Sequence, residues 1–262
     1  GQMHACGHDG HMAILLELAR RLHGKERLPH NVLLVFQCAE ETTGGARDIC
    51  QSGIFEAYHV KAIFGLHLWP GLPAGQVFSR KNELMCRSCE VKIHFSGRSA
   101  HIAKAREGLD ALAAAVYFYE KAAALEHQLP PDSWGLLKFG KLEAGTVCNA
   151  IAGEARLEGS LRAFRQEDFE FLRGGLEAIA AETQAQTHCA VTLDISQGYP
   201  AVMNPPALLD TAARAVDFGL LPEPSMTAED FSWYQRYLSG MFFFLGTGDT
   251  PALHADTFDF DE

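Results

Sequence analysis

The chain has 262 residues, 47% of them hydrophobic, and a formal net charge of -11 at pH 7. This length can bury one large core or two moderate cores, and we expect two domains. The acidic balance argues against a nucleic-acid partner, because no basic stripe is present to neutralise phosphates. The most apolar tracts have the length of strands, so we expect no membrane span. Seven cysteines without the spacing of a disulfide framework favour free thiols and a cytoplasmic protein.

The first part of the chain has the pattern of an α/β domain with a mostly parallel sheet. Apolar residues at helical spacing predict a helix over residues 11–22. A continuous apolar run over residues 32–36 predicts a strand covered on both faces, and AIFGLHLWP, residues 62–70, predicts a second buried strand. A loop and a short helix are expected between the two strands. Alternating helices and strands of this kind form layers around a parallel sheet.

The pattern changes near residue 82. From there to residue 197, clean alternation of apolar and polar residues predicts half-exposed strands, and the elements follow the order β-α-β-β-α-β. This is the order of a ferredoxin-like domain. Residues 198–262 return to the first pattern, with helices expected over 206–216 and 225–238 and an apolar strand over 240–246. We therefore expect residues 1–81 and 198–262 to form one α/β domain, interrupted by an insert at 82–197.

The opening stretch GQMHACGHDGHM places a thiol and several imidazoles within a few residues. Thiolate, neutral imidazole and carboxylate are the side chains that bind divalent transition metals. Similar side chains follow the expected strands, and the whole set is Cys6, His8, Glu40, Glu41, His67 and His254. Each residue alone is more often an ordinary loop or packed side chain. Because parallel strands present their carboxyl ends to one crevice, the joint placement favours a metal site at that edge.

Seven motifs in order carry a resemblance to a known family. They are MHACGHDGH, FQCAEETTGGA, IFGLHLWP, GRSAHIA, GTVCNAIAGEARLEGSLR, AEDFSWY and FFFLGTG with its following LH. Together they resemble the M20 metallopeptidase family, especially its amidohydrolase branch of aminoacylases, hippurate hydrolases and N-acetyldiaminopimelate deacetylases. The resemblance implies a catalytic domain interrupted by a ferredoxin-like lid and dimerisation domain, a homodimer formed through that lid, and an N-acyl amino acid as substrate.

The resemblance also implies two divalent metal ions, either Zn, Mn, Ni or Co. Their implied ligands are Cys6, His8, Glu41, His67 and His254. Glu40 is the implied general base, which takes a proton from the attacking water and delivers it to the departing amine. A metal pair suits this reaction, since it lowers the pKa of water and polarises the amide carbonyl.

Residues of the insert are expected to act on the substrate. His101 is implied to stabilise the oxyanion in the active site of the partner subunit. Asn149 and Arg162 are implied to bind the substrate, Arg162 through forked hydrogen bonds to a carboxylate. A solvated position on a strand face explains Arg162 nearly as well. His11 has no implied ligand role, and helix capping explains the acids of the AEDF motif, Glu229 and Asp230, about as well as a function.

The sequence departs from the family at two places. The lid histidine is commonly followed by a Pro-His pair, where this chain has Lys104 and Ala105. The family's opening strands, with an Arg-x-Asp-x-Asp-type segment, and its closing helix are absent, which predicts a fragment or a truncated paralogue with a reorganised sheet. The alternative function is therefore a metal-binding, dimerising protein with impaired catalysis. A cysteine nucleophile with His8 as its base is a weaker alternative, because residues two apart rarely present an attack geometry.

Overall fold

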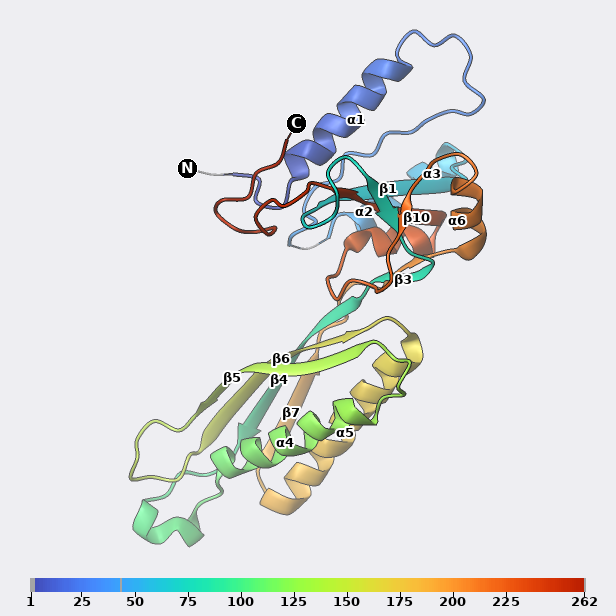
Figure 1. The fold of residues 1–262 in the computed structure, drawn as a ribbon. Coiled ribbons are helices and arrows are strands. Elements are labelled where there is room, and N and C mark those ends of the chain that lie inside the picture. The colour runs from blue at the N-terminus through green and yellow to red at the C-terminus, as the bar shows by residue number, and fades with distance from the viewer. Residues whose placement is uncertain (1–2, 43, 262) are drawn as a thin grey trace. The chain divides into compact units, whose positions relative to one another are not determined.

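The computed structural model describes residues 3–42 and 44–261, which form two compact units. The first unit comprises the chain up to Met85, Val202–Ser225 and the chain from Glu229 onward. The second, which we call the inserted unit, comprises Cys86–Ala201 with Met226–Ala228. The first unit is thus assembled from segments that the inserted unit separates in the sequence (Figure 1).

The first unit contains a four-stranded sheet in the order β1-β10-β2-β9. β1 (Ala62–Trp69) and β10 (Ser239–Gly246) run parallel, β2 (Val77–Ser79) is antiparallel to β10, and β9 (Gly219–Leu220) is parallel to β2. β3 (Asn82–Met85) and β8 (Val202–Asn204) form a separate antiparallel ribbon. The helices are α1 (His8–Leu22), α2 (Ala46–Gln51), α3 (Ile54–Ala57), α6 (Pro206–Ala212) and the 3-10 helix η3 (Asp230–Arg236). The expected α/β class is confirmed.

The core of the first unit is aromatic and lies around β10. Phe231 of η3 contacts Phe242 with ring centroids 4.9 Å apart, and Trp69 stacks on Phe244 at 3.9 Å. Asn204 fixes the middle of β10, since its side chain accepts from the Phe242 amide at 2.9 Å and donates to the Phe242 carbonyl at 3.1 Å. These contacts hold β10 and β1 in register, and both strands lead to candidate site residues.

The expected strand over residues 32–36 is wrong. In the described part of the chain this stretch forms no strand, and Phe36 is 51% exposed. Only part of the stretch packs inward, because Val35 lies against the core. β1 is also less covered than expected: it is an edge strand, and Phe64 is 57% exposed. An apolar run becomes a strand only when a neighbouring backbone pairs with it, and here none does.

The inserted unit has the expected β-α-β-β-α-β order. Its elements are β4 (Arg87–Ser96), α4 (Ala111–Leu125), β5 (Gly135–Ala144), β6 (Glu154–Ala163), α5 (Gln166–Thr187) and β7 (Ala190–Ile195), with 3-10 turns η1 (Ile102–Glu107) and η2 (Glu126–Gln128). The sheet order is β5-β6-β4-β7, and every pairing is antiparallel. Both long helices lie on one face of this sheet (Figure 1). The unit is therefore ferredoxin-like.

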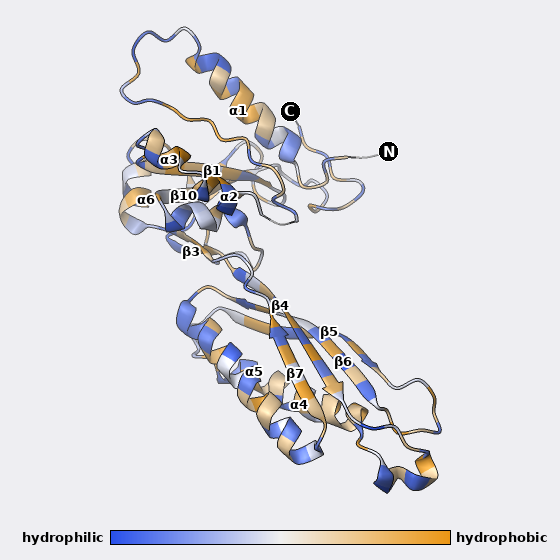
Figure 2. Cartoon of the chain, turned by 180° about the vertical axis from the view of Figure 1, so that it is seen from behind, coloured by the Kyte–Doolittle hydropathy of each residue, from blue (hydrophilic) through white to orange (hydrophobic). Residues whose placement is uncertain are grey.

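Alternation along the strands divides the inserted sheet into a covered and an open face (Figure 2). On β4 the apolar residues of the alternating pattern, Cys89, Val91, Ile93 and Phe95, are all buried. The opposite face carries ion pairs such as Lys92 with Glu90 at 2.6 Å. None of the helices in the described part of the chain is both long and apolar enough to span a bilayer.

We predict that Phe118→Ala lowers the free energy of unfolding by about 3–5 kcal/mol, because it removes a large side chain from a dense core. Phe118 is fully buried on α4 and meets Phe95 edge-on at 5.6 Å. Val116→Ala is the matched control on the same helix, since Val116 is 42% exposed and its loss should change the stability by no more than about 0.5 kcal/mol. Urea denaturation measures both variants, and equal losses would contradict the assignment of the core.

Candidate metal centre

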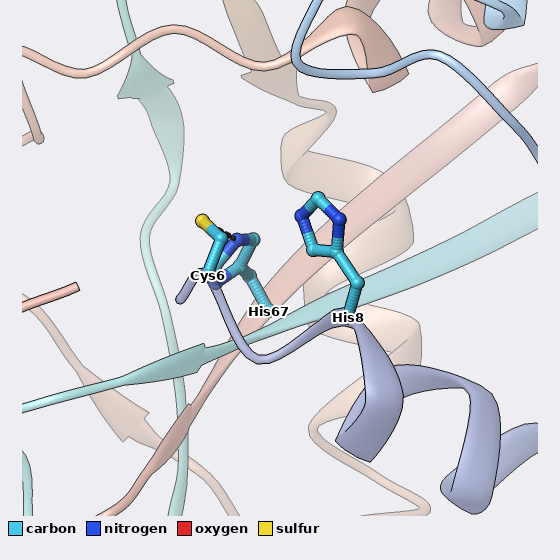
Figure 3. A group of neighbouring side chains, drawn as sticks. All are labelled: Cys6, His8 and His67. Atoms are coloured by element: carbon cyan, nitrogen blue, oxygen red, sulfur yellow. Dashed lines mark hydrogen bonds between the residues drawn. The ribbon is translucent and has the colours of Figure 1, made fainter. Parts of the chain in front are cut away.

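The turn before α1 places Cys6 and His8 side by side. Gly7 adopts a left-handed conformation with φ 76°, and its amide donates to the His4 carbonyl at 3.1 Å. A Cβ at this position would lie 2.9 Å from Leu68 Cδ1, so the turn requires glycine both for its φ and for space. The two flanking side chains consequently project toward the end of β1 (Figure 3).

His67 near the end of β1 presents its second nitrogen to this turn. Its side chain is buried, and Nδ1 lies 2.7 Å from the Leu68 carbonyl oxygen. A carbonyl only accepts, so Nδ1 carries the proton and Nε2 keeps its lone pair. Nε2 lies 3.4 Å from Cys6 Sγ (Figure 3). This is the tautomer that a metal-binding histidine needs.

His254 reaches the same thiol from the loop that follows β10. Its backbone amide donates to the Ala5 carbonyl at 2.7 Å, which fixes the loop beside the Cys6 turn. His254 has a φ of 67°, a conformation that a non-glycine residue adopts only when its surroundings hold it there. Its Nε2 lies 3.1 Å from Cys6 Sγ and 3.5 Å from Glu41 Oε1.

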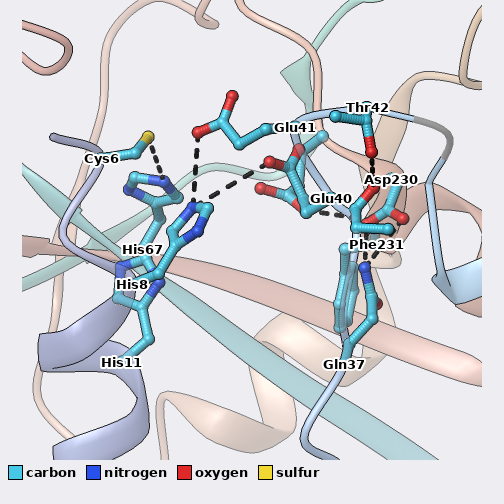
Figure 4. A network of polar contacts seen from close by, with 12 residues as sticks. Cys6, His8, His11, Gln37, Glu40, Glu41, Thr42, His67, Asp230 and Phe231 are labelled. Carbon is cyan, nitrogen blue, oxygen red and sulfur yellow. Dashed lines mark hydrogen bonds and ion pairs between the residues drawn. The ribbon is translucent and has the colours of Figure 1, made fainter. Parts of the chain in front are cut away.

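Glu40 and Glu41 approach from the loop before α2. His8 Nε2 lies 3.6 Å from Glu41 Oε1 and 4.0 Å from Glu40 Oε2 (Figure 4). The structure thus brings Cys6, His8, Glu40, Glu41, His67 and His254 together within the first unit. Two sets of three share the thiol, each with ligand atoms within 4.8 Å of one another: Cys6, His8, His67 and Cys6, Glu41, His254.

The donor atoms are spaced as the ligands of a metal ion are. Metal–ligand bonds of about 2.0–2.3 Å at tetrahedral angles separate neighbouring ligand atoms by about 3.3–3.8 Å. The contacts of 3.1–3.6 Å among Cys6, His8, Glu41, His67 and His254 are close to that range. The residues present therefore fit divalent metal ions.

The pKa shifts within the cluster also indicate a site for a cation. Burial, and then the neighbouring Glu41 carboxylate, raise the pKa of the Cys6 thiol well above its usual range. Burial is also the main reason why the pKa of Glu40 rises to about 7, with further contributions from the charges of Glu41 and Asp230. Burial lowers the pKa of His67 to about 4. A bound cation would stabilise the thiolate and the carboxylates, so the cluster is complementary to positive charge.

His11 has a supporting position that the motif did not reveal. It lies one turn after His8 on α1, and its Nε2 accepts from the Leu68 amide at 3.0 Å. Its ring contacts that of His67, with centroids 4.4 Å apart. Burial, followed by the charges of His67 and His8, lowers its pKa to about 3. His11 is therefore a neutral side chain that supports β1 and the ring of His67. In the sequence, only its helical spacing from His8 indicates this role.

His101 and Asn149 lie close together in the inserted unit. The Ile102 amide donates to the Asn149 carbonyl at 3.0 Å, and His101 pairs with Ala150. His101 begins η1 as its N-cap, where Nδ1 accepts from the Ala103 amide at 3.2 Å. Both side chains are exposed, so His101 and Asn149 are available to another molecule.

Arg162 does not join His101 and Asn149 within this unit. It lies at the far end of β6, opposite Ser88, whereas the strand begins at Glu154 near the other two residues. Eight residues of strand span about 26 Å. The Arg162 Nη1 donates to the Met226 carbonyl, and its buried Nε has no hydrogen-bond partner among the described residues. The expected solvated strand face is thus an incomplete description, because part of the guanidinium is buried.

Comparison with known proteins defines the family. The model of peptidase family M20/M25/M40 matches residues 1–262. An N-acetyldiaminopimelate deacetylase of Streptococcus pneumoniae is 35% identical over 264 residues, covering 97% of this chain and 69% of the relative. That of Shouchella clausii is 33% identical over 261 residues, with the same coverage. The Bacillus subtilis YXEP protein, described as a dinuclear metal binding peptidase from the M20 family, has a TM-score of 0.81 at 28% identity, covering 99% of this chain and 68% of that one.

The chain belongs to peptidase family M20/M25/M40. The resemblance seen in the motifs is confirmed, as is the architecture that it implied. Within this family the protein is a metal-dependent hydrolase that acts on amide bonds, and divalent metal ions are its cofactors.

We predict that protonation of His11 destabilises the metal-free protein. Its pKa is about 3 in the folded state against an ordinary 6.5, so between these values the unfolded chain binds a proton that the folded chain does not. This contribution to stability is complete above pH 6.5 and is lost as the pH falls toward 3. His11→Gln retains an acceptor but does not titrate. As the pH falls, the free energy of unfolding of this variant should therefore decrease less steeply than that of the wild type, and the two slopes should differ by up to about 1.4 kcal/mol per pH unit. Urea denaturation of the wild type and of His11→Gln at pH 6.5 and 4.5 measures this difference. If both proteins lose the same free energy of unfolding between the two pH values, the prediction is wrong.

Proposed function

We propose that the protein hydrolyses the amide bond of N-acyl amino acids with the help of two divalent metal ions. The observation that carries this proposal is the convergence of four candidate ligands around the Cys6 thiol, although Cys6 and His254 are 248 positions apart. Relatives named N-acetyldiaminopimelate deacetylase support an N-acyl amino acid as substrate and make N-acetyldiaminopimelate the first compound to test.

The two sets of three donors suggest how the ions are held. Cys6, His8 and His67 would hold one ion, and Cys6, Glu41 and His254 would hold the other. Thiolate, imidazole and carboxylate ligands together suit Zn, Mn, Ni or Co. When bound, such ions lower the pKa of a water molecule and polarise the amide carbonyl.

Glu40 is the proposed general base. It lies beside the ligands, 4.0 Å from His8 Nε2, and it is only partly exposed. Its partly buried position beside the candidate ligands suits a group that takes a proton from water and then returns it to the leaving amine. Adjacent Glu41 faces both His8 and His254, so the two glutamates divide the tasks of proton transfer and metal binding.

The inserted unit supplies the proposed substrate contacts. His101 would stabilise the oxyanion in the partner subunit's active site, and Asn149 beside it would hold the substrate. Arg162, with part of its guanidinium committed to Met226, would bind a substrate carboxylate. The role of His101 requires a homodimer, which we propose is formed through the inserted unit. The seven free thiols favour the cytoplasm as the place where the protein acts.

We predict that Glu40→Gln retains the metal ions and lowers kcat on N-acyl amino acids by about 100- to 10,000-fold, because it removes proton transfer alone. Metal content per chain and release of acetate or benzoate are the measurements. Glu56→Gln, an exposed glutamate of α3, is the control and should be as active as the wild type. If the Glu40→Gln variant still turns over substrate at the wild-type rate, Glu40 is not the general base. Bound metal with no turnover in the wild type would favour the alternative, a metal-binding dimer.

We also predict that Cys6→Ser weakens both metal positions whereas His254→Ala weakens one. Cys6 is shared by the two sets of donors and His254 belongs to a single set. Metal per chain after dialysis should therefore fall toward none in Cys6→Ser and toward half of the wild-type value in His254→Ala. Activity that resists chelators and is lost in Cys6→Ser would instead indicate a thiol nucleophile.

A further inference from the structure

Glu40 and Glu41 lie on a tight loop, of which the structure describes residues 38–42, 44 and 45, and which we call the glutamate loop. Within its described residues, Ala39 and Gly44 adopt left-handed conformations with φ 63° and 76°, and the Gly44 amide donates to the Ala39 carbonyl at 2.8 Å. The ends of the loop are in contact, since a Cβ on Gly45 would lie 2.1 Å from the Cys38 carbonyl oxygen. A loop of this shape needs its two ends to be held together.

One carboxylate holds both ends. Gln37, just before the loop, donates through Nε2 to both oxygens of Asp230 at 2.8 Å. Ala46, just after the loop, donates its backbone amide to Asp230 Oδ2 at 3.0 Å (Figure 4 shows Gln37 beside Asp230). Asp230 is only 1% exposed, so these hydrogen bonds lie away from water, where they are strongest.

Asp230 and Gln37, which we call the clamp, are themselves held by the core. Asp230 begins η3, whose aromatic side chains pack against β10. Tyr234 of the same helix donates its hydroxyl to Gln37 Oε1 at 2.6 Å, so Gln37 is bound at both ends of its amide. The glutamate loop is thereby tied to the aromatic core of the first unit.

We propose that Asp230 is a positioning residue for the metal centre. By closing the glutamate loop it keeps Glu41 facing His8 and His254 and keeps Glu40 beside them. The proposal rests on the proposed function for the roles of the two glutamates. Asp230 also lies near Glu40 and Glu229, in a group whose ligand atoms are within 4.8 Å of one another. Both of its oxygens already accept hydrogen bonds, and Glu229 caps the Phe231 amide at 3.3 Å, so neither is assigned as a ligand.

The test exchanges the two partners of the clamp. Asp230→Asn leaves a single oxygen to accept from both Gln37 and Ala46 and sets its amide group against the Gln37 donor. Gln37→Glu sets one carboxylate against another. In the double variant the new amide donates to the new carboxylate, and the Ala46 amide and Tyr234 hydroxyl keep their acceptors. The net charge is also unchanged. Ser232→Ala is the control, because Ser232 is buried on the same helix and its hydroxyl has no partner among the described residues.

Two readouts separate positioning from bulk stability. In the metal-free protein, hydrogen exchange at the Gly44 and Ala46 amides should become at least about tenfold faster in each single variant. The affinity for Co²⁺, followed by its absorption spectrum, should fall about 10- to 100-fold in the same variants, the range seen when a residue that supports a metal ligand is removed. The double variant should recover both properties, and Ser232→Ala should match the wild type.

The outcomes are distinct from those that test the proposed function. If the single variants keep wild-type exchange and Co²⁺ affinity, or if the double variant recovers neither, Asp230 does not position the loop. If exchange responds as expected but the wild type binds no Co²⁺, the clamp is real and the proposed metal function is wrong. Recovery of both readouts in the double variant supports the proposal.

Discussion

The main physical constraint on the first unit is that several titratable side chains have to be held close together at the candidate metal centre. A thiol, two carboxylates and several imidazoles lie together, and burial disfavours the charged forms of Cys6, Glu40 and His67. Bringing such groups together is unfavourable without a cation, so the surrounding chain has to hold them there by other means. The left-handed turn at Gly7, the buried strand end at His67 and the hydrogen bond between His254 and Ala5 are those means.

Much of this arrangement was predictable because the signals are local. Alternation along the strands of the inserted unit fixes which side chains face its helices, and the structure confirms both the order and the inward face of β4. The convergence of His67 and His254 followed from two strands expected to be parallel, and β1 and β10 do run parallel. The failure at residues 32–36 has a physical reason, since an apolar run does not indicate whether a neighbouring strand is available.

The supporting residues were not predictable, because their roles depend on partners distant in the sequence. Gln37 and Asp230 are 193 positions apart, and neither side chain alone suggests a clamp. The sequence suggests helix capping for both acids of the AEDF motif. It accounts for Glu229, which binds the nearby Phe231 amide, whereas Asp230 caps a different helix through Ala46. His11 likewise acts on Leu68, a residue that no local pattern connects with it.

The hydrogen bond between the His254 amide and the Ala5 carbonyl also sets an order of events during synthesis. A growing chain exposes Cys6, His8, Glu41 and His67 while the residue that completes the cluster has not yet been made. Closing so long a span is entropically expensive, and it waits until β10 has paired with β1. The Cys6 thiol therefore lacks its His254 neighbour until the last segment of the first unit has been made.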